Sequence, residues 1–150
     1  MDQIEGILLT PLKIIEGRDG NVLHALKRQE ESFVDFGEAY FSTVNHGAVK
    51  GWKKHRRMTL NLVVPLGAIW FVLYDDRAQS PTYKIVQELM LSPEARESYQ
   101  RLTVPPGVWM SFKGMGERLN LLLNIASIPH DPTEAENLHI GNDLIPYDWK

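Results

Sequence analysis

The residues most able to do chemistry lie between positions 49 and 62, in the stretch VKGWKKHRRMTLNL. Basic and imidazole side chains surround one Gly-Trp pair there, and an apolar run follows directly. Clustered cations at a concave surface attract anions, and phosphate is the commonest such ligand. A solvated rim of charge that binds nothing would have the same composition. The cationic cluster consists of Lys50, Lys53, Lys54, His55, Arg56 and Arg57.

A strand is expected directly after this cluster, over residues 60–64. Side chains of a strand alternate between its two faces, so polar residues at its start are expected near the open end of a barrel, where a ligand would enter. Lys53 and His55 are two residues apart, so on an extended chain both face the same side. Trp52 is expected at the same mouth, where its flat apolar face could stack on a ring.

Short apolar or β-branched runs, separated by glycine and proline, recur along the whole chain. Their spacing predicts an all-β fold of the sandwich or jelly-roll type, with few or no long helices. The stretch 82–91 fits either a strand or a helix, and its bounded length favours a strand. A tight hairpin is expected at 65–67 and one helical turn at 132–138. Strands are expected over 4–15, 22–26, 37–45, 58–76 (two), 82–91 and 101–127 (two or three).

Composition narrows the class of protein. The 150-residue chain fits one domain over 1–150, long enough to bury about 70% of its unfolded surface. It contains no cysteine, which excludes disulfides and thiolate metal sites and fits a reducing compartment. A formal charge of −3 argues against a nucleic-acid partner. Neither a signal peptide nor a membrane span is recognisable, so we expect a cytoplasmic protein without a membrane partner.

Several blocks of the sequence resemble one known family over nearly the whole chain. The blocks are GILLTPLKII, VKGWKKHRRMTLNLVVPLGAIWFVLYDDRAQSPTYKIVQELML, RLTVPPGVWMSF, PHDPTEAENL and IPYDW. They are similar to the dTDP-4-dehydrorhamnose 3,5-epimerase family of cupins. The resemblance implies a cupin-type double-stranded β-helix (jelly roll), usually a homodimer, that uses neither a metal nor another cofactor. It implies a nucleoside-diphosphate 4-keto-6-deoxyhexose as substrate, with proton exchange beside the ketone through a His base, its Asp partner and a Tyr acid.

The sequence departs from the family pattern at the residues that carry this chemistry. Lys53 stands where the family's Arg-Gly-Leu-His motif has the base, and Met110 replaces the histidine of the PPGFxHxF motif. Asn124, within a residue or two, stands where the family has its tyrosine. Asp143 survives as the candidate partner carboxylate. An ion pair between Lys53 and Asp143 is expected in place of the family's His-Asp pair.

His55 is the candidate base. In the sugar 3,4-ketoisomerases, a sister group of the same cupins, the motif resembles Arg-Gly-Phe-His-x-His, and its second histidine matches His55. A rim imidazole bonded to a carbonyl or a phosphate is the alternative role. If the protein is an enzyme of this kind, a set of binding residues is expected, in which Lys50 and Arg57 hold the diphosphate and Trp52 or Trp109 packs the base or the sugar. Lys53, Asn61, Met110 and Asn124 complete this set.

Two functions follow from these features. The first is an epimerase or isomerase of a nucleoside-diphosphate keto-sugar, in deoxysugar or surface-polysaccharide biosynthesis. The second is a non-catalytic cupin that has kept the anion-binding mouth and lost the catalytic His and Tyr. Deuterium exchange beside the ketone distinguishes them, because only the enzyme removes a proton from carbon.

Overall fold

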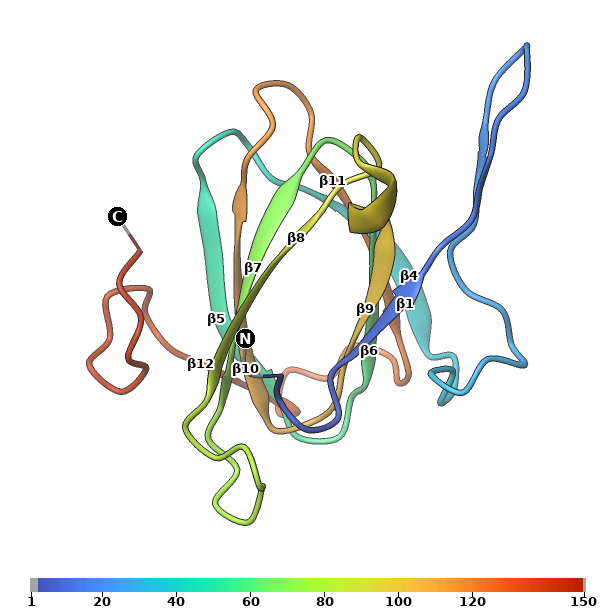
Figure 1. Ribbon diagram of the computed structural model, residues 1–150. Coiled ribbons are helices and arrows are strands. Elements are labelled where there is room, and N and C mark those ends of the chain that lie inside the picture. The colour runs from blue at the N-terminus through green and yellow to red at the C-terminus, as the bar shows by residue number, and fades with distance from the viewer. Residues whose placement is uncertain (1–2, 150) are drawn as a thin grey trace.

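Two five-stranded antiparallel sheets face each other in the computed structural model, which describes residues 3–149 (Figure 1). The first sheet has the order β1 (Leu8–Pro11), β9 (Gln100–Val104), β6 (Leu60–Leu66), β11 (Leu121–Ala126) and β4 (Glu38–Thr43). The second has the order β12 (Ala135–Asn137), β5 (Val49–His55), β10 (Val108–Gly114), β7 (Ile69–Asp75) and β8 (Val86–Leu91). The predicted all-β jelly roll is confirmed. The helix in residues 3–149 is a 3-10 turn, η1 (Arg96–Ser98), and no helix there could span a membrane.

The main core lies between the two sheets. Alternate residues of β6, β7, β9 and β11 point inward, as the period of two requires. Their side chains exclude water completely at the centre of the molecule, where Leu62, Phe71, Leu73, Leu102 and Leu122 are all fully buried. The sheets are therefore held together by apolar packing, and polar groups inside the barrel gather away from this centre.

A second apolar layer covers the outer face of the second sheet. Trp52, Tyr74 and Trp109 lie there against the C-terminal segment, which contributes Ile145 and Tyr147. The Tyr147 hydroxyl donates to Glu88 Oε1 at 2.6 Å. This segment, at the left in Figure 1, therefore seals the side of the sheet opposite the barrel interior.

Two local predictions are wrong. Residues 65–67 do not form a hairpin, because β6 belongs to the first sheet and β7 to the second. Turn residues promote any reversal of the chain, and here the reversal crosses between sheets. Residues 132–138 form a turn followed by β12, because Ala135–Asn137 pair with Lys53–His55 of β5 instead of coiling. The prediction of a strand within 82–91 is confirmed by β8.

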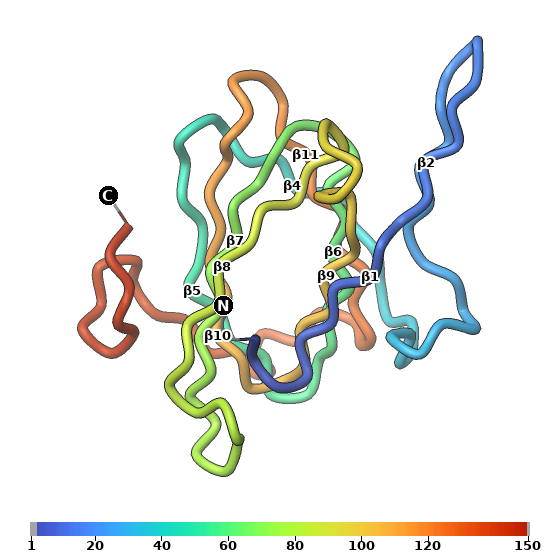
Figure 2. The backbone as a smooth tube through the Cα atoms, viewed as in Figure 1, coloured from blue at the N-terminus to red at the C-terminus, as the bar shows by residue number. Residues whose placement is uncertain are grey.

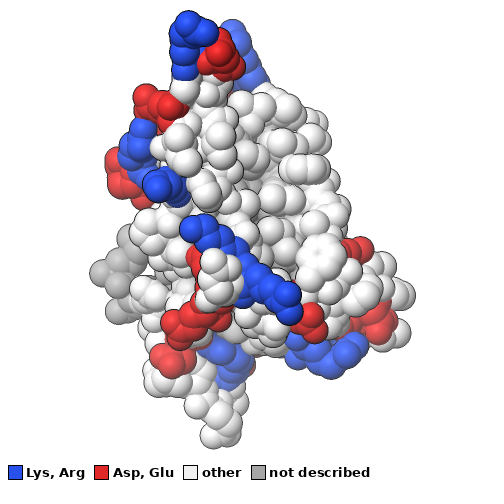
Figure 3. All heavy atoms as spheres, turned by 90° about the vertical axis from the view of Figure 1, so that its right-hand side faces the viewer, with Lys and Arg blue, Asp and Glu red and all other residues white. Residues whose placement is uncertain are grey.

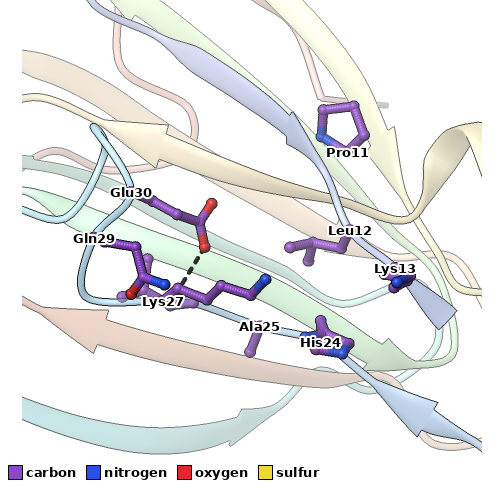
Figure 4. A pocket seen from close by; sticks show the side chains of 9 residues that line it. Pro11, Leu12, Lys13, His24, Ala25, Lys27, Gln29 and Glu30 are labelled. Carbon is purple, nitrogen blue, oxygen red and sulfur yellow. Dashed lines mark hydrogen bonds between the residues drawn. The ribbon is translucent and has the colours of Figure 1, made fainter. Parts of the chain in front are cut away.

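A thin arm leaves the barrel between β1 and β4. It carries the two-stranded ribbon of β2 (Ile14–Ile15) and β3 (Val22–Leu23), and it projects from the body at the upper right (Figures 1 and 2). Its root is fixed by Arg101, which is fully buried and donates to the Ala25 carbonyl at 2.7 Å and to Glu30 Oε2 at 2.9 Å. A cavity of about 360 Å³ opens at this root (Figure 4), where Glu30 accepts from the Lys27 backbone N–H.

Asp75 fixes the loop between β7 and β8. Its buried carboxylate accepts from Arg77 Nε at 2.8 Å, Ser80 Oγ at 2.6 Å and Thr82 Oγ1 at 2.7 Å. Burial alone would raise the pKa of Asp75, but the hydrogen bonds from Arg77, Ser80 and Thr82 outweigh it and lower the pKa to about 2. The carboxylate is therefore ionised at all pH values at which the protein is expected to work.

Acid should remove the stabilisation that Asp75 provides. A group whose pKa is lowered on folding stabilises the protein above its unfolded pKa, and the stabilisation is lost as the pH falls through the folded value. We expect the unfolding free-energy difference between wild type and Asp75→Asn to shrink by about 2 kcal/mol between pH 4 and pH 2. Urea unfolding across this range measures it, with the exposed Asp19→Asn as the control. A difference that is independent of pH would contradict the assignment.

Candidate active site

A bulge in β5 decides which of its side chains face the barrel interior. Lys53 lies opposite Met110 of β10, and Gly51 lies opposite the next residue, Ser111, so Trp52 is an extra residue on the β5 side. The bulge turns Lys50 and Lys53 inward together, although they are three positions apart and regular alternation would place them on opposite faces. Trp52 points to the outer face, and its side chain is 1% exposed.

The inward side chains enclose a cavity of about 300 Å³ between the two sheets. The second sheet contributes basic residues and an apolar floor, and the first sheet contributes hydroxyl and amide groups. Small-molecule sites typically combine a shaped apolar wall with a few polar groups in this way. The lining residues are Tyr40, Ser42, Lys50, Gly51, Lys53, His55, Leu60, Met110, Phe112 and Asn124.

His55 is paired with a carboxylate at the rim of this cavity. Its Nδ1 lies 2.6 Å from Glu134 Oε1, and the Glu134 side chain is almost fully buried. The other oxygen, Oε2, accepts backbone N–H groups from Arg57 and, at 3.0 Å, from Met58. A carboxylate beside Nδ1 holds the proton there and leaves the lone pair of a neutral imidazole on Nε2. His55 is therefore oriented as a base.

The environment keeps Glu134 ionised. Burial by itself would raise the pKa of Glu134, but the backbone N–H of Arg57 and the His55 ring outweigh it, and the net effect lowers the pKa. The negative charge then stabilises the imidazolium that forms when His55 takes up a proton, as in other His-carboxylate pairs.

Tyr40 offers a proton donor in the same cavity. It lies on β4 directly opposite Asn124 of β11. Burial, followed by the charge of Glu38, raises the pKa of Tyr40, so its phenol carries its proton at neutral pH. Asn124 Nδ2 lies 3.3 Å from Ser42 Oγ on the neighbouring strand. A base from one sheet and an acid from the other thus share one site.

Half of the predicted site residues line this cavity. Lys53 and His55 face the same side, as the spacing predicts. The residues in the cavity are Lys50, Lys53, His55, Met110 and Asn124.

The other half lie elsewhere. Trp52 packs on the outer face of the second sheet because of the bulge, and Trp109 packs there because of the strand alternation. Neither side chain therefore lies at the mouth of the cavity. Asn61 faces away from the cavity, and its Oδ1 accepts from Arg101 Nε at 3.1 Å and from Thr103. Arg57 pairs with Asp131, its Nη2 3.6 Å from Oδ2, in an exposed loop.

The predicted Lys53–Asp143 ion pair is wrong. Asp143 lies in an exposed turn beyond β12, and no ion pair joins it to Lys53 within residues 3–149. Glu134 occupies the place of the partner carboxylate, and its partner is His55. Lys54 points outward and pairs with Asp76 at 3.1 Å, over the Trp109 ring.

Sequence reasoning missed Glu134, Tyr40 and Ser42. The signal for Tyr40 and Ser42 was present, because they are two residues apart on a predicted strand and must share a face. Glu134 gave no such signal, because it precedes a three-residue strand that resembles a helix start. Its role depends on the pairing of β12 with β5, which lies about 80 residues away along the chain.

The chain is similar to nucleotide-sugar enzymes along nearly its whole length. A dTDP sugar isomerase from Desulfovibrio desulfuricans G20 superposes with a TM-score of 0.93 at 38% identity, over 97% of this chain and 92% of that chain. The probable low-salt glycan biosynthesis epimerase of Haloferax volcanii is 26% identical over 150 residues, covering 99% of this chain and 91% of that protein. No protein-family model matches the sequence.

A more distant structure shares the fold. The dTDP-6-deoxy-D-glucose-3,5-epimerase of Legionella pneumophila, solved in complex with dTDP-4-keto-L-rhamnose, has a TM-score of 0.83 at 21% identity, over 99% of this chain and 80% of that chain. A jelly roll with a polar site between its sheets is the architecture of the cupins, one of several jelly-roll classes. The identity to the Desulfovibrio isomerase then shows that the chain belongs to the dTDP-4-dehydrorhamnose 3,5-epimerase-like family of carbohydrate epimerases and isomerases.

The bulge requires glycine at position 51. Gly51 has φ +120°, and an added Cβ would lie 2.8 Å from the Ser111 Cα and from the Met110 carbonyl oxygen. Gly51→Ala should therefore strain the backbone and push β5 from β10, lowering the free energy of unfolding by at least about 2 kcal/mol. Urea unfolding measures this, with Gly47→Ala as control, because Gly47 has φ +78° but open space around it. Equal losses in the two variants would show that the strand contact is unimportant.

Proposed function

We propose that this chain is an enzyme that epimerises or isomerises a nucleoside-diphosphate 4-keto-6-deoxyhexose, with dTDP as the nucleotide. The observation that carries the proposal is the His55–Glu134 pair at 2.6 Å beside an interior cavity. Cations are sufficient to bind an anionic ligand, whereas a histidine oriented by a buried carboxylate is the arrangement of a general base. The similarity to a dTDP sugar isomerase supports the choice of substrate.

The reaction begins beside the ketone, which acidifies the hydrogen on the neighbouring carbon. His55 Nε2 takes this proton, the C–H electron pair becomes a C=C bond, and the carbonyl electrons move to oxygen to give an enolate. A proton returned to the same carbon from the opposite side inverts that centre. A proton returned to the former carbonyl carbon, with the hydroxyl proton passing between the oxygens, moves the ketone instead.

The placement of the acid favours inversion. Tyr40 comes from the first sheet and His55 from the second, so the phenol can deliver its proton from a different wall than the one that holds the base. The resulting phenolate and imidazolium then exchange protons with solvent. Lys50, whose Nζ donates to the Thr43 carbonyl at 2.7 Å, is a fixed positive charge at the cavity for the diphosphate.

Deuterium exchange tests the reaction and the role of the base. In heavy water the wild type is expected to incorporate deuterium at C3 or C5 of dTDP-4-keto-6-deoxyglucose, as followed by NMR. Loss of the base in His55→Asn should slow the exchange by roughly 10² to 10⁴-fold. His130→Asn, an exposed histidine in a loop outside the cavity, serves as the control and should leave the rate unchanged. Exchange by His55→Asn at the wild-type rate would refute the assignment.

Glu134→Gln tests the His55–Glu134 pair and keeps an oxygen that can accept hydrogen bonds from the loop backbone. The amide oxygen can still accept the N–H groups of Arg57 and Met58, while the amide N–H₂ donates to Nδ1 and forces the His55 proton onto Nε2. We expect cooperative thermal unfolding to persist and the exchange rate to fall nearly as far as in His55→Asn. A variant that exchanges normally would exclude Glu134 as the group that orients the base.

We also propose that two copies of the chain associate through the side of the molecule that carries the arm. Ile15 and Val22 of the arm are exposed, as are Phe36 and Phe41 near or on β4, the last at 65%. Figure 3 views this side and shows a broad uncharged area beside the arm. Exposed apolar patches of this kind support association with another protein surface, and the exposed strands of the arm offer unpaired backbone groups.

Sedimentation velocity tests the association. The wild type is expected to sediment at twice the mass of one chain, and Phe41→Glu should shift it towards the monomer. Leu144→Glu, equally exposed but in the C-terminal segment, should not. A monomeric wild type would exclude the dimer, and an unchanged Phe41→Glu would exclude this surface.

A further inference from the structure

The enolate of the proposed reaction needs a positive charge, and Lys53 is positioned to supply it. The cavity has three basic side chains, all from β5. Lys50 already donates to the Thr43 carbonyl, and His55 is bound to Glu134. Within residues 3–149 no carboxylate forms an ion pair with Lys53. Its ammonium group is therefore available to a ligand.

Strand geometry places this ammonium beside the base. Lys53 and His55 share the inward face of β5, about 6.6 Å apart along a strand. A long flexible side chain covers that distance. The carbon that loses its proton and the carbonyl oxygen are separated by one further carbon atom. A sugar that presents its C–H to His55 can therefore present its ketone oxygen to Lys53 in the same orientation.

The remaining lining offers little competition for this role. Leu60, Met110 and Phe112 are apolar, and Asn124 already shares a hydrogen bond with Ser42. Donors aimed at the oxygen where charge develops are often the largest contribution to catalysis, because exclusion of water by the substrate strengthens them. Among the described lining residues, Lys53 combines a full charge with freedom to reach the oxygen.

We propose that Lys53, as an ammonium ion, donates a hydrogen bond to the ketone oxygen and stabilises the enolate formed when His55 removes the neighbouring proton. The inference rests on the proposed function. Lys53 keeps its proton throughout: one proton passes from carbon to Nε2, the C–H electron pair forms the C=C bond, and the carbonyl electron pair moves to the oxygen beside Lys53. No covalent bond to the lysine forms.

The kinetics of two variants test the assignment. Lys53→Met should slow deuterium exchange into dTDP-4-keto-6-deoxyglucose at saturation by roughly 10² to 10³-fold, with KM and the Kd for dTDP changed by less than about threefold. Lys53→Arg, which keeps the charge, should recover to within about tenfold of wild type. Lys27→Met, a lysine at the arm root, is the control. Calorimetry with dTDP alone provides a readout that does not depend on turnover.

Each contrary result has its own signature. A raised Kd for dTDP with kcat preserved would assign Lys53 to the diphosphate and overturn the inference, as would a Lys53→Met variant as fast as wild type. Borohydride reduction that traps the sugar on Lys53 would overturn it in favour of an imine. A wild type that binds dTDP but exchanges no deuterium would refute the proposed function, and the inference with it.

Discussion

One extra residue in β5 determines the arrangement of the site. Without the bulge at Gly51 and Trp52, strict alternation would send Lys50 and Lys53 to opposite faces of the sheet. With it, both lysines and His55 face the cavity, while Trp52 moves to the outer face and anchors the C-terminal segment. A single irregularity of the backbone thus builds the polar interior and the apolar exterior of the same sheet. The steric demand for glycine at this point is a direct consequence.

The basic residues between positions 50 and 57 lie on different faces of the sheet and have different partners. Lys54 is neutralised on the outer face by Asp76 and Glu136. Arg57 pairs with Asp131 in the loop beside the rim. Arg56 lies outside the cavity, where its Nη1 donates to the Thr133 carbonyl at 2.6 Å, and the inward members are the ones at the site. The cavity therefore carries much less charge than the sequence suggests, and a mildly acidic protein can hold a small cationic site without a broad cationic surface.

The periodic features of the fold could be predicted from sequence, and the long-range ones could not. Alternation located most strands and put Lys53 and His55 on one face. It failed for Trp52, because a bulge leaves no mark in the pattern of residue types, and for residues 65–67, because the same turn residues serve hairpins and crossovers between sheets. The prediction of Asp143 as the partner carboxylate failed for a similar reason. Which carboxylate reaches His55 depends on how β12 pairs with β5, and that pairing is tertiary.

Glu134 joins the site to the framework. One of its oxygens faces the His55 ring, and the other is held by the backbone of Arg57 and Met58. The carboxylate is therefore held in one orientation beside the imidazole. The electrostatic field in which the ring gains and loses its proton is fixed once the chain has folded. Little reorganisation remains for the moment of reaction. Because the same group shapes the rim, removal of the partner of the base would also disturb the loop that leads into β6.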